Sequence, residues 1–225
     1  MKSPWAALAL MLLALVGGCG AAPFKRPPLP TLNDPDPQAM RDGFAHNLPN
    51  QFTSDDTVII QAPFHDDLAV LAVLRVDRAA QTFEFVGLSQ FGVKLFHLSG
   101  DRSGTTIRFA IPPLLAHTNV LLSIAQDIRK MYFDLVPAAD SAVHVGRTIV
   151  CFTQKTPQGK LVYEFGGNPA VLLDKHLDGF FGPVWRARYY EYSAPADGFY
   201  PHGIVMDNGQ FHYRIIVKNR IWAVQ

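Results

Sequence analysis

The sequence predicts an α+β fold: one large, curved antiparallel β-sheet of about ten to twelve strands, an incomplete barrel, packed with one main amphipathic helix. Short apolar runs separated by turn residues fill residues 57–111 and again residues 147–224. Between the two series, apolar residues recur at spacings of three and four, which indicates a helix. The composition, 48% hydrophobic and 17% charged, is that of a chain able to bury a core.

The first 18 residues predict a secretory signal. One charge, Lys2, precedes the twelve apolar residues Trp5–Val16, fewer than the roughly 20 that a membrane-spanning helix needs. The run Val16–Cys19 resembles the lipobox of bacterial lipoproteins, in which an aliphatic residue and two small ones precede the cysteine that is acylated after cleavage. The alternative is an ordinary signal peptide with a coincidental cysteine.

Removal of residues 1–18 leaves 19 basic and 19 acidic side chains, so the mature chain has no net charge. A chain without a basic field is not expected to bind nucleic acid. Attachment to a membrane would therefore depend on the acyl chains of Cys19, and several chains hold a protein far more durably than one. Because Gly20 rather than Asp follows the cysteine, the resemblance implies sorting to the outer membrane, on its periplasmic face.

Residues 19–37 predict a tether between the acylated cysteine and a single domain at 38–225. Six prolines lie between Pro23 and Pro37, and such a segment favours the extended polyproline geometry of a semi-rigid spacer. The alternative is that part of the segment lies along the surface of the domain.

The first strand series reads as an antiparallel meander, because its links are of hairpin size. The run Leu68–Leu74 is continuously apolar, and the alternation in residues 91–98 places large apolar side chains on both faces. The strands of this series are predicted at residues 57–61, 67–76, 82–89, 91–98 and 105–111.

One amphipathic helix is predicted from Thr118 to Leu135, between Pro113 and Pro137, with polar residues such as Asp127 on its far side. With balanced charges, its apolar face is expected to pack on the sheet rather than on a membrane. A second strand series follows at residues 147–154, 160–165, 170–173, 184–192, 202–206, 211–218 and 220–224.

Catalytic and metal-binding patterns are weak. The eight histidines are scattered singly, so no metal site and no cofactor are predicted. The best local group is His65-Asp66-Asp67, for which a solvated turn is the alternative to a hydrolase site. Cys151 lies in an apolar strand, where a thiol is a poor nucleophile. The sequence therefore predicts a protein that is not an enzyme.

Aromatic side chains are abundant in both strand series. One sheet face is expected to pack against the helix, and apolar residues on the other suggest a cavity for an apolar ligand; the alternative is an ordinary filled core. The residues predicted to line the cavity are Phe83, Phe85, Phe96, Leu98, Phe109, Leu121, Ile128 and Trp185. Two Gly- and Pro-containing loops place aromatic pairs at their tips, as membrane or partner contacts or, alternatively, folded back over the sheet. These tip residues are Phe180, Phe181, Phe199 and Tyr200.

The stretch Leu74–Leu98, the break at Pro112–Leu115 and the following helix resemble the bacterial lipoproteins grouped as DUF3261. Those proteins are similar in organisation to the outer-membrane lipoprotein carrier and receptor (Lol-type) family. The resemblance implies a curved antiparallel sheet capped by helices over an acyl-chain cavity. It also implies an anchored periplasmic lipoprotein that binds or transfers an acylated molecule without catalysis and meets envelope transport proteins. The alternative is a non-catalytic scaffold of an envelope complex.

Overall fold

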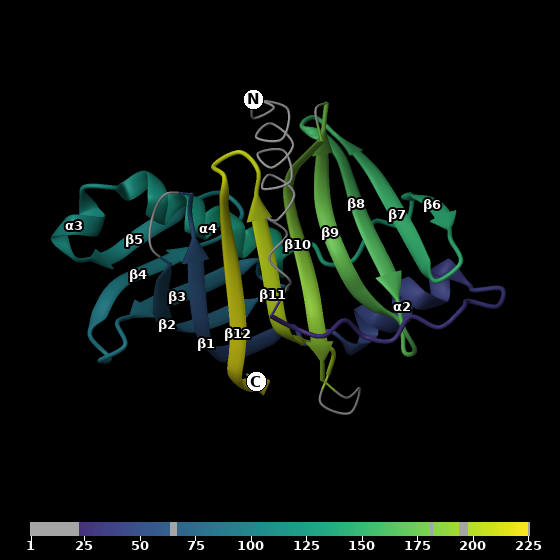
Figure 1. Cartoon of the computed structure of the whole chain (residues 1–225), viewed down its shortest axis with the longest axis horizontal. Coiled ribbons are helices and arrows are strands. Elements are labelled where there is room, and N and C mark those ends of the chain that lie inside the picture. Colours follow the sequence, from purple (N-terminus) through teal and green to yellow (C-terminus); the bar gives the residue numbers. More distant parts are fainter. Residues whose placement is uncertain (1–22, 64–66, 181, 194–197, 225) are drawn as a thin grey trace, which may run out of the picture.

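The structure, a computed structural model, describes residues 23–63, 67–180, 182–193 and 198–224 (Figure 1). The predicted α+β architecture is confirmed: a 12-stranded antiparallel sheet carries three helices in the described part of the chain. The strand order is β5-β4-β3-β2-β1-β12-β11-β10-β9-β8-β7-β6, so the two halves of the sheet join where β1 pairs with β12. The edge strands β5 and β6 are not paired with each other, and the sheet remains open.

The element bounds follow the chain. The helices are α2 (Pro37–Asn47), α3 (Pro112–Leu115) and α4 (Thr118–Tyr132). The strands of the first half are β1 (Gln51–Gln61), β2 (Leu68–Asp77), β3 (Thr82–Leu88), β4 (Lys94–Gly100) and β5 (Thr105–Ala110). Those of the second half are β6 (Ala142–Val145), β7 (Ile149–Thr156), β8 (Gly159–Gly166), β9 (Val171–Gly179), β10 (Gly182–Tyr192), β11 (Pro201–Asn208) and β12 (Tyr213–Val224).

Several strand bounds differ from the predicted ones, for local reasons. β1 begins at Gln51 because its polar first half pairs with both β2 and β12. The last two predicted strands form one, β12, and the irregularity near Asn219 is a register shift opposite β1 rather than a break. β6 was not predicted because its four residues are all exposed. β9 continues past residue 173 because its charged residues are buried there and have partners.

Helix α4 has the predicted type and start, but it ends three residues early because Phe133 adopts an extended backbone conformation. Its buried side chains pack on the face of the sheet that we call the inner face. They include Leu121, Ala125, Ile128 and Tyr132.

Helix α2 was not predicted. Asp36 caps its start by accepting hydrogen bonds from the backbone N–H groups of Gln38 (2.9 Å) and Ala39 (3.1 Å), and Pro37 occupies the first turn. Phe44 packs edge-on against Phe165 on the inner face, with ring centroids 5.2 Å apart. Both α2 and α4 therefore cover the same face of the sheet.

The proline-rich segment lies along the domain surface, the second of the two arrangements considered. The Phe24 ring packs near Tyr190 on the opposite, outer face of the sheet, with centroids 5.6 Å apart. Further along, the Leu32 N–H donates to the carbonyl of Arg147 (2.9 Å). Cys19 and the predicted signal peptide lie outside the described residues. No helix in the described ranges is both long and apolar enough to cross a membrane.

Candidate functional site

A broad apolar layer covers the inner face beneath α4. It is built from five neighbouring strands, and the residues that face the helix are Asp56, Val58, Ile60, Val70, Leu74, Phe85, Phe96, Ile215 and Val217. The helix contributes Ile124, Ile128, Met131 and Tyr132. Asp56 is the sole ionisable strand residue in this set.

The space left between helix and sheet is about 20 Å³, enough for roughly one water molecule. Sites for small molecules usually measure about 300–1,000 Å³. The interior is therefore closed and filled by its own side chains, as in the alternative of an ordinary core. A ligand of any size could enter only if α4 moved.

Most of the residues predicted to line a cavity do meet in this interior. Phe85, Phe96 and Ile128 border the remaining space. The others that are buried in the same core are Phe83, Leu98, Leu121 and Trp185.

Phe109 does not join that interior. Its side chain is 40% exposed on the edge strand β5, and the ammonium group of Lys94 lies 5.0 Å from the centre of its ring. An edge strand lacks a neighbour on one side, so an apolar residue there can remain uncovered although the strand pattern is apolar.

The aromatic residues predicted at the two loop tips lie in different environments in the structure. Phe180 is 94% exposed between β9 and β10. Phe199, in contrast, is buried because its ring stacks on Phe44 of α2, with centroids 6.1 Å apart. Tyr200 is half-buried beside His202. Phe181 lies outside the described residues.

The C-terminal end of α4 is anchored to the sheet by polar groups. The buried Lys175 ammonium of β9 donates to the carbonyls of Phe133 (2.7 Å) and Lys130 (3.2 Å). The Tyr189 hydroxyl donates to the carbonyl of Met131 (3.0 Å). These donors satisfy carbonyls that the end of a helix leaves without partners. Burial lowers the pKa of Lys175 to about 8, because its charged form loses hydration.

A second anchor lies one turn earlier, at Asp127. Its carboxylate is completely buried and accepts hydrogen bonds from Lys130 (2.7 Å), from Asn208 (3.2 Å) and from the Tyr213 hydroxyl. Burial, followed by the charge of Asp127, raises the pKa of Tyr213, so its hydroxyl stays protonated and donates. The helical period placed Asp127 on the solvent side, but β11 and β12 lie there and supply its donors.

A third anchor joins α4 to the turn between β4 and β5. The Arg129 guanidinium donates to the carbonyl of Asp101 (2.6 Å) and to the Thr105 hydroxyl (2.9 Å). Partial burial lowers the pKa of Arg129.

The N-terminal half of α4 has a different environment. The side chain of the capping residue His117 makes no cap hydrogen bond, and Val120 is 51% exposed. In the described part of the chain, the side-chain hydrogen bonds that join α4 to the sheet involve residues 127–133. Apolar contacts of Leu121 and Ala125, both completely buried, hold the first half. The helix is thus fixed by polar bonds at one end and by apolar packing alone at the other.

Two polar groups face the apolar layer. The Asp56 carboxylate accepts a hydrogen bond from the Ser54 hydroxyl (3.1 Å). The Tyr132 hydroxyl is buried and has no hydrogen-bond partner among the described residues. Burial, followed by the charge of Asp56, raises the pKa of Tyr132, so the group remains an O–H donor. Tyr132 recurs at the helical period with the apolar residues Leu121, Ile128 and Leu135, and nothing in that pattern shows its hydroxyl to be without a partner.

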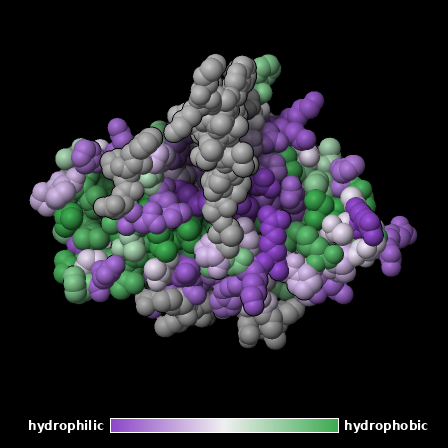
Figure 2. All heavy atoms as spheres, viewed as in Figure 1, coloured by the Kyte–Doolittle hydropathy of each residue, from purple (hydrophilic) through white to green (hydrophobic). Residues whose placement is uncertain are grey.

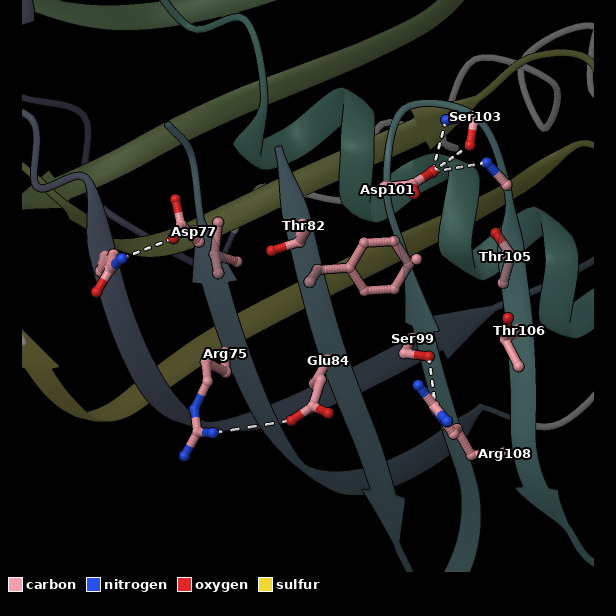
Figure 3. A pocket seen from close by; sticks show the side chains of 15 residues that line it. Arg75, Asp77, Thr82, Glu84, Ser99, Asp101, Ser103, Thr105, Thr106 and Arg108 are labelled. Carbon is pink, nitrogen blue, oxygen red and sulfur yellow. Dashed lines mark hydrogen bonds and ion pairs between the residues drawn. The ribbon is translucent and has the colours of Figure 1, made fainter. Parts of the chain in front are cut away.

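A polar groove of about 730 Å³ lies on the outer face across β1 to β5 (Figure 3). Its charged groups pair along neighbouring strands: Arg75 with Glu84 (3.8 Å), and Arg108 with the Ser99 hydroxyl (2.9 Å). An open groove lined by hydroxyl and charged groups does not suit an acyl chain.

The described residues offer little for covalent or metal chemistry. Within the described ranges, no group of three or more His, Cys, Asp or Glu side chains could hold a metal ion. Burial, followed by the nearby Glu164, raises the pKa of the Cys151 thiol, which makes it a poor nucleophile. Of the predicted turn group, His65 and Asp66 lie outside the described residues, and Asp67 accepts a hydrogen bond from Gln61 (2.7 Å).

Comparison with solved structures shows what this fold resembles. A LolA superfamily protein from Nitrosomonas europaea is 8% identical with a TM-score of 0.51, covering 84% of this chain and 93% of that chain. A putative outer membrane lipoprotein-sorting protein domain from Vibrio parahaemolyticus has a TM-score of 0.45 at 8% identity, covering 83% and 91%. A DUF1329 family protein from Desulfovibrio piger has a TM-score of 0.46 at 7% identity, covering 85% and 94%.

No protein-family model matches the chain, and no curated protein sequence matches it. The likeness to the Nitrosomonas protein extends over most of both chains, so this chain shares the fold of a LolA superfamily protein. At 8% identity the likeness concerns the fold alone.

Proposed function

We propose that this chain is a non-catalytic lipoprotein of the bacterial envelope that binds or transfers an acylated molecule on the inner face beneath α4. Acylation of Cys19 would anchor it to the periplasmic face of the outer membrane, as in the DUF3261 lipoproteins that it resembles. The observation that carries the proposal is an apolar layer five strands wide, covered by a helix whose polar anchors lie at one end. The shared LolA-type fold is consistent with it.

Binding requires the N-terminal half of α4 to lift from the sheet. Re-exposing one large aliphatic side chain costs about 1.5–3 kcal/mol. Leu121 and Ile124 are the large residues of that half facing the core, so opening costs on the order of 5 kcal/mol. Each methylene taken out of water contributes about 0.8 kcal/mol. About six methylenes therefore offset the cost, and a longer acyl chain leaves a net gain.

The polar groups beneath the helix favour one kind of acyl head. The Tyr132 hydroxyl is an available donor for a carbonyl oxygen. The Asp56 carboxylate is buried close enough to raise the pKa of Tyr132 and would repel a second carboxylate. An acyl ester or amide is therefore preferred to a free fatty acid.

The test uses the unacylated Cys19→Ser protein, purified without detergent. We expect uptake of a fluorescent acyl ester, bound lipid in native mass spectra, and weaker uptake of the corresponding free acid. Ile124→Trp, which places a larger side chain where the acyl chain would lie once α4 has lifted, should abolish uptake. Val120→Trp, on the exposed side of the same helix, should leave it unchanged. A folded protein that takes up neither ligand contradicts the proposal.

The filled interior and the exposed Phe180 favour a second candidate, a non-catalytic scaffold or interaction module of an envelope complex. A photo-crosslinker at Phe180 that captures one envelope protein in cells, together with absent acyl-ester uptake, would support this candidate. Envelope transport proteins are the expected partners under both proposals.

A further inference from the structure

The outer face of the sheet carries an apolar strip that neither α2 nor α4 covers. Antiparallel sheets with one packed face normally present polar residues on the other. Here half-buried aliphatic side chains pair across β2 and β3, Leu88 with Leu71 and Val86 with Val73. On β1 the two rows end at Thr57 and Asp55, and the half-buried Ile59 lies two residues beyond Thr57. Figure 2 shows hydrophobic surface over this half of the sheet. We call Ile59, Leu71, Val73, Val86 and Leu88 the outer strip. An apolar patch on a sheet face that no helix covers is a candidate interaction site.

The chain's first described residues are fixed beside the outer strip. The Phe24 ring lies directly over Gly203 of β11, where an added Cβ atom would come within 2.5 Å of the ring. The Lys25 N–H donates to the Glu191 carboxylate (3.0 Å). The Lys218 ammonium lies 6.0 Å from the centre of the Phe24 ring. Phe24 packs on a small apolar cluster of the outer face formed by Tyr190, Val205 and Ile216. Ile216 pairs with Ile59 of the outer strip, so the cluster and the strip adjoin.

The length of chain before Phe24 limits where a membrane can be. Phe24 follows Cys19 by five positions, and five residue steps span at most about 18 Å when the chain is fully extended. An acylated cysteine sits at the headgroup level of a bilayer. The bilayer surface would then lie within that distance of the outer face. Lys25, Arg26 and Lys218 are exposed there and match anionic headgroups.

We propose that the outer strip and the adjoining basic residues rest on the surface of a phospholipid bilayer, while α4 and the inner face point to the aqueous side. The inference rests on the acylation of Cys19 in the proposed function. It implies that an acylated ligand exchanges on the side of the domain away from the anchoring membrane.

The experiment uses the acylated protein with Cys151→Ser and one labelled cysteine. The label replaces Thr57, in the middle of the outer strip, or Gln126, on the exposed side of α4. The protein is reconstituted in phosphatidylethanolamine–phosphatidylglycerol vesicles that carry a nitroxide on the lipid headgroups. We expect the Thr57 label to lose most of its fluorescence and the Gln126 label to keep it. A second pair, at Leu88 and Ser123, repeats the comparison in case one label disturbs the fold.

Equal quenching at the two sites, or stronger quenching at Gln126, would overturn the proposed orientation. Inserting about ten Gly and Ser residues between Ala22 and Pro23 should reduce the quenching at Thr57; an unchanged value would overturn the role of the short link. Flotation with the vesicles reports anchoring separately. A protein that fails to float refutes acylation at Cys19 and this inference with it, whereas acyl-ester uptake tests the ligand site independently.

Discussion

The buried lysine beneath the end of α4 should make the stability of the protein rise with pH in the alkaline range. Lys175 is fully enclosed and donates to two carbonyls at the helix end. Burial holds its pKa at about 8, against 10.5 for an ordinary lysine. We therefore consider the substitution Lys175→Met, which keeps the length of the side chain and removes its titration.

The direction of the pH dependence follows from how many protons Lys175 binds in the folded and in the unfolded chain. Below pH 8, the lysine is protonated in both the folded and the unfolded chain, so it contributes no pH dependence. Between pH 8 and pH 10.5 the unfolded chain binds more protons, and the free energy of unfolding rises with pH. The slope approaches about 1.4 kcal/mol per pH unit, and the full gain is about 3 kcal/mol. Above pH 10.5 no further gain occurs.

The assay is urea denaturation of the Cys19→Ser protein followed by circular dichroism at intervals from pH 7 to 10. The raised pKa values of the buried Tyr132 and Tyr189 lower stability as pH passes 10. The informative quantity is therefore the difference between wild type and Lys175→Met. That difference should change in favour of wild type as pH rises, whereas Lys160→Met, at an exposed strand position, should follow wild type. A difference that stays constant with pH would refute the reasoning, as would a Lys175 ¹³Cε titration near pH 10.5.

Three further substitutions test the packing of α4 and of the N-terminal segment. Leu121→Ala should lower the free energy of unfolding by about 2–5 kcal/mol. Val120→Ala, at the preceding, half-exposed position, should change the free energy of unfolding by no more than about 0.5 kcal/mol. Equal urea midpoints for the two variants would contradict this. Asp127→Ala leaves buried donors without their acceptor and should cost about 3 kcal/mol in the same assay, so a near-neutral effect would show that this network does not fix the helix. Gly203→Ala should displace Phe24 and speed proteolysis of the N-terminal segment, with little added effect in a Phe24→Ala background; additive effects would argue against the contact.

Helix α2 and the second half of β9 were missed in the sequence for identifiable reasons. Helix α2 has a cap signal in the sequence, Asp36 followed by Pro37, that could have been used. Its polar composition hides it, because a single aromatic residue, Phe44, supplies most of its packing. β9 was predicted too short because Asp174 and His176 suggested a surface, yet they pair with each other (2.8 Å) and are buried.

The candidate site was predictable in part. Phe85, Phe96 and Ile128 were predicted to line one apolar interior, and they do border the same space beneath α4. The periods of strands and helices are local properties, so they can be read without a structure. The exposure of Phe109 and the burial of Phe199 depend on neighbours from distant parts of the chain. The pattern was misleading for Phe109, whereas for Phe199 it left both exposure and folding back over the sheet open.

By itself the sequence determined the antiparallel α+β architecture, the single long helix and the absence of a recognisable catalytic motif, because these depend on the spacing and chemistry of nearby residues. Only the tertiary structure decided that the interior beneath α4 is closed, that Asp127 and Lys175 anchor one end of the helix, and that Phe24 is held on the outer face. Each depends on how side chains from separate strands fill a shared volume, and that fit is not encoded in the period of any one segment.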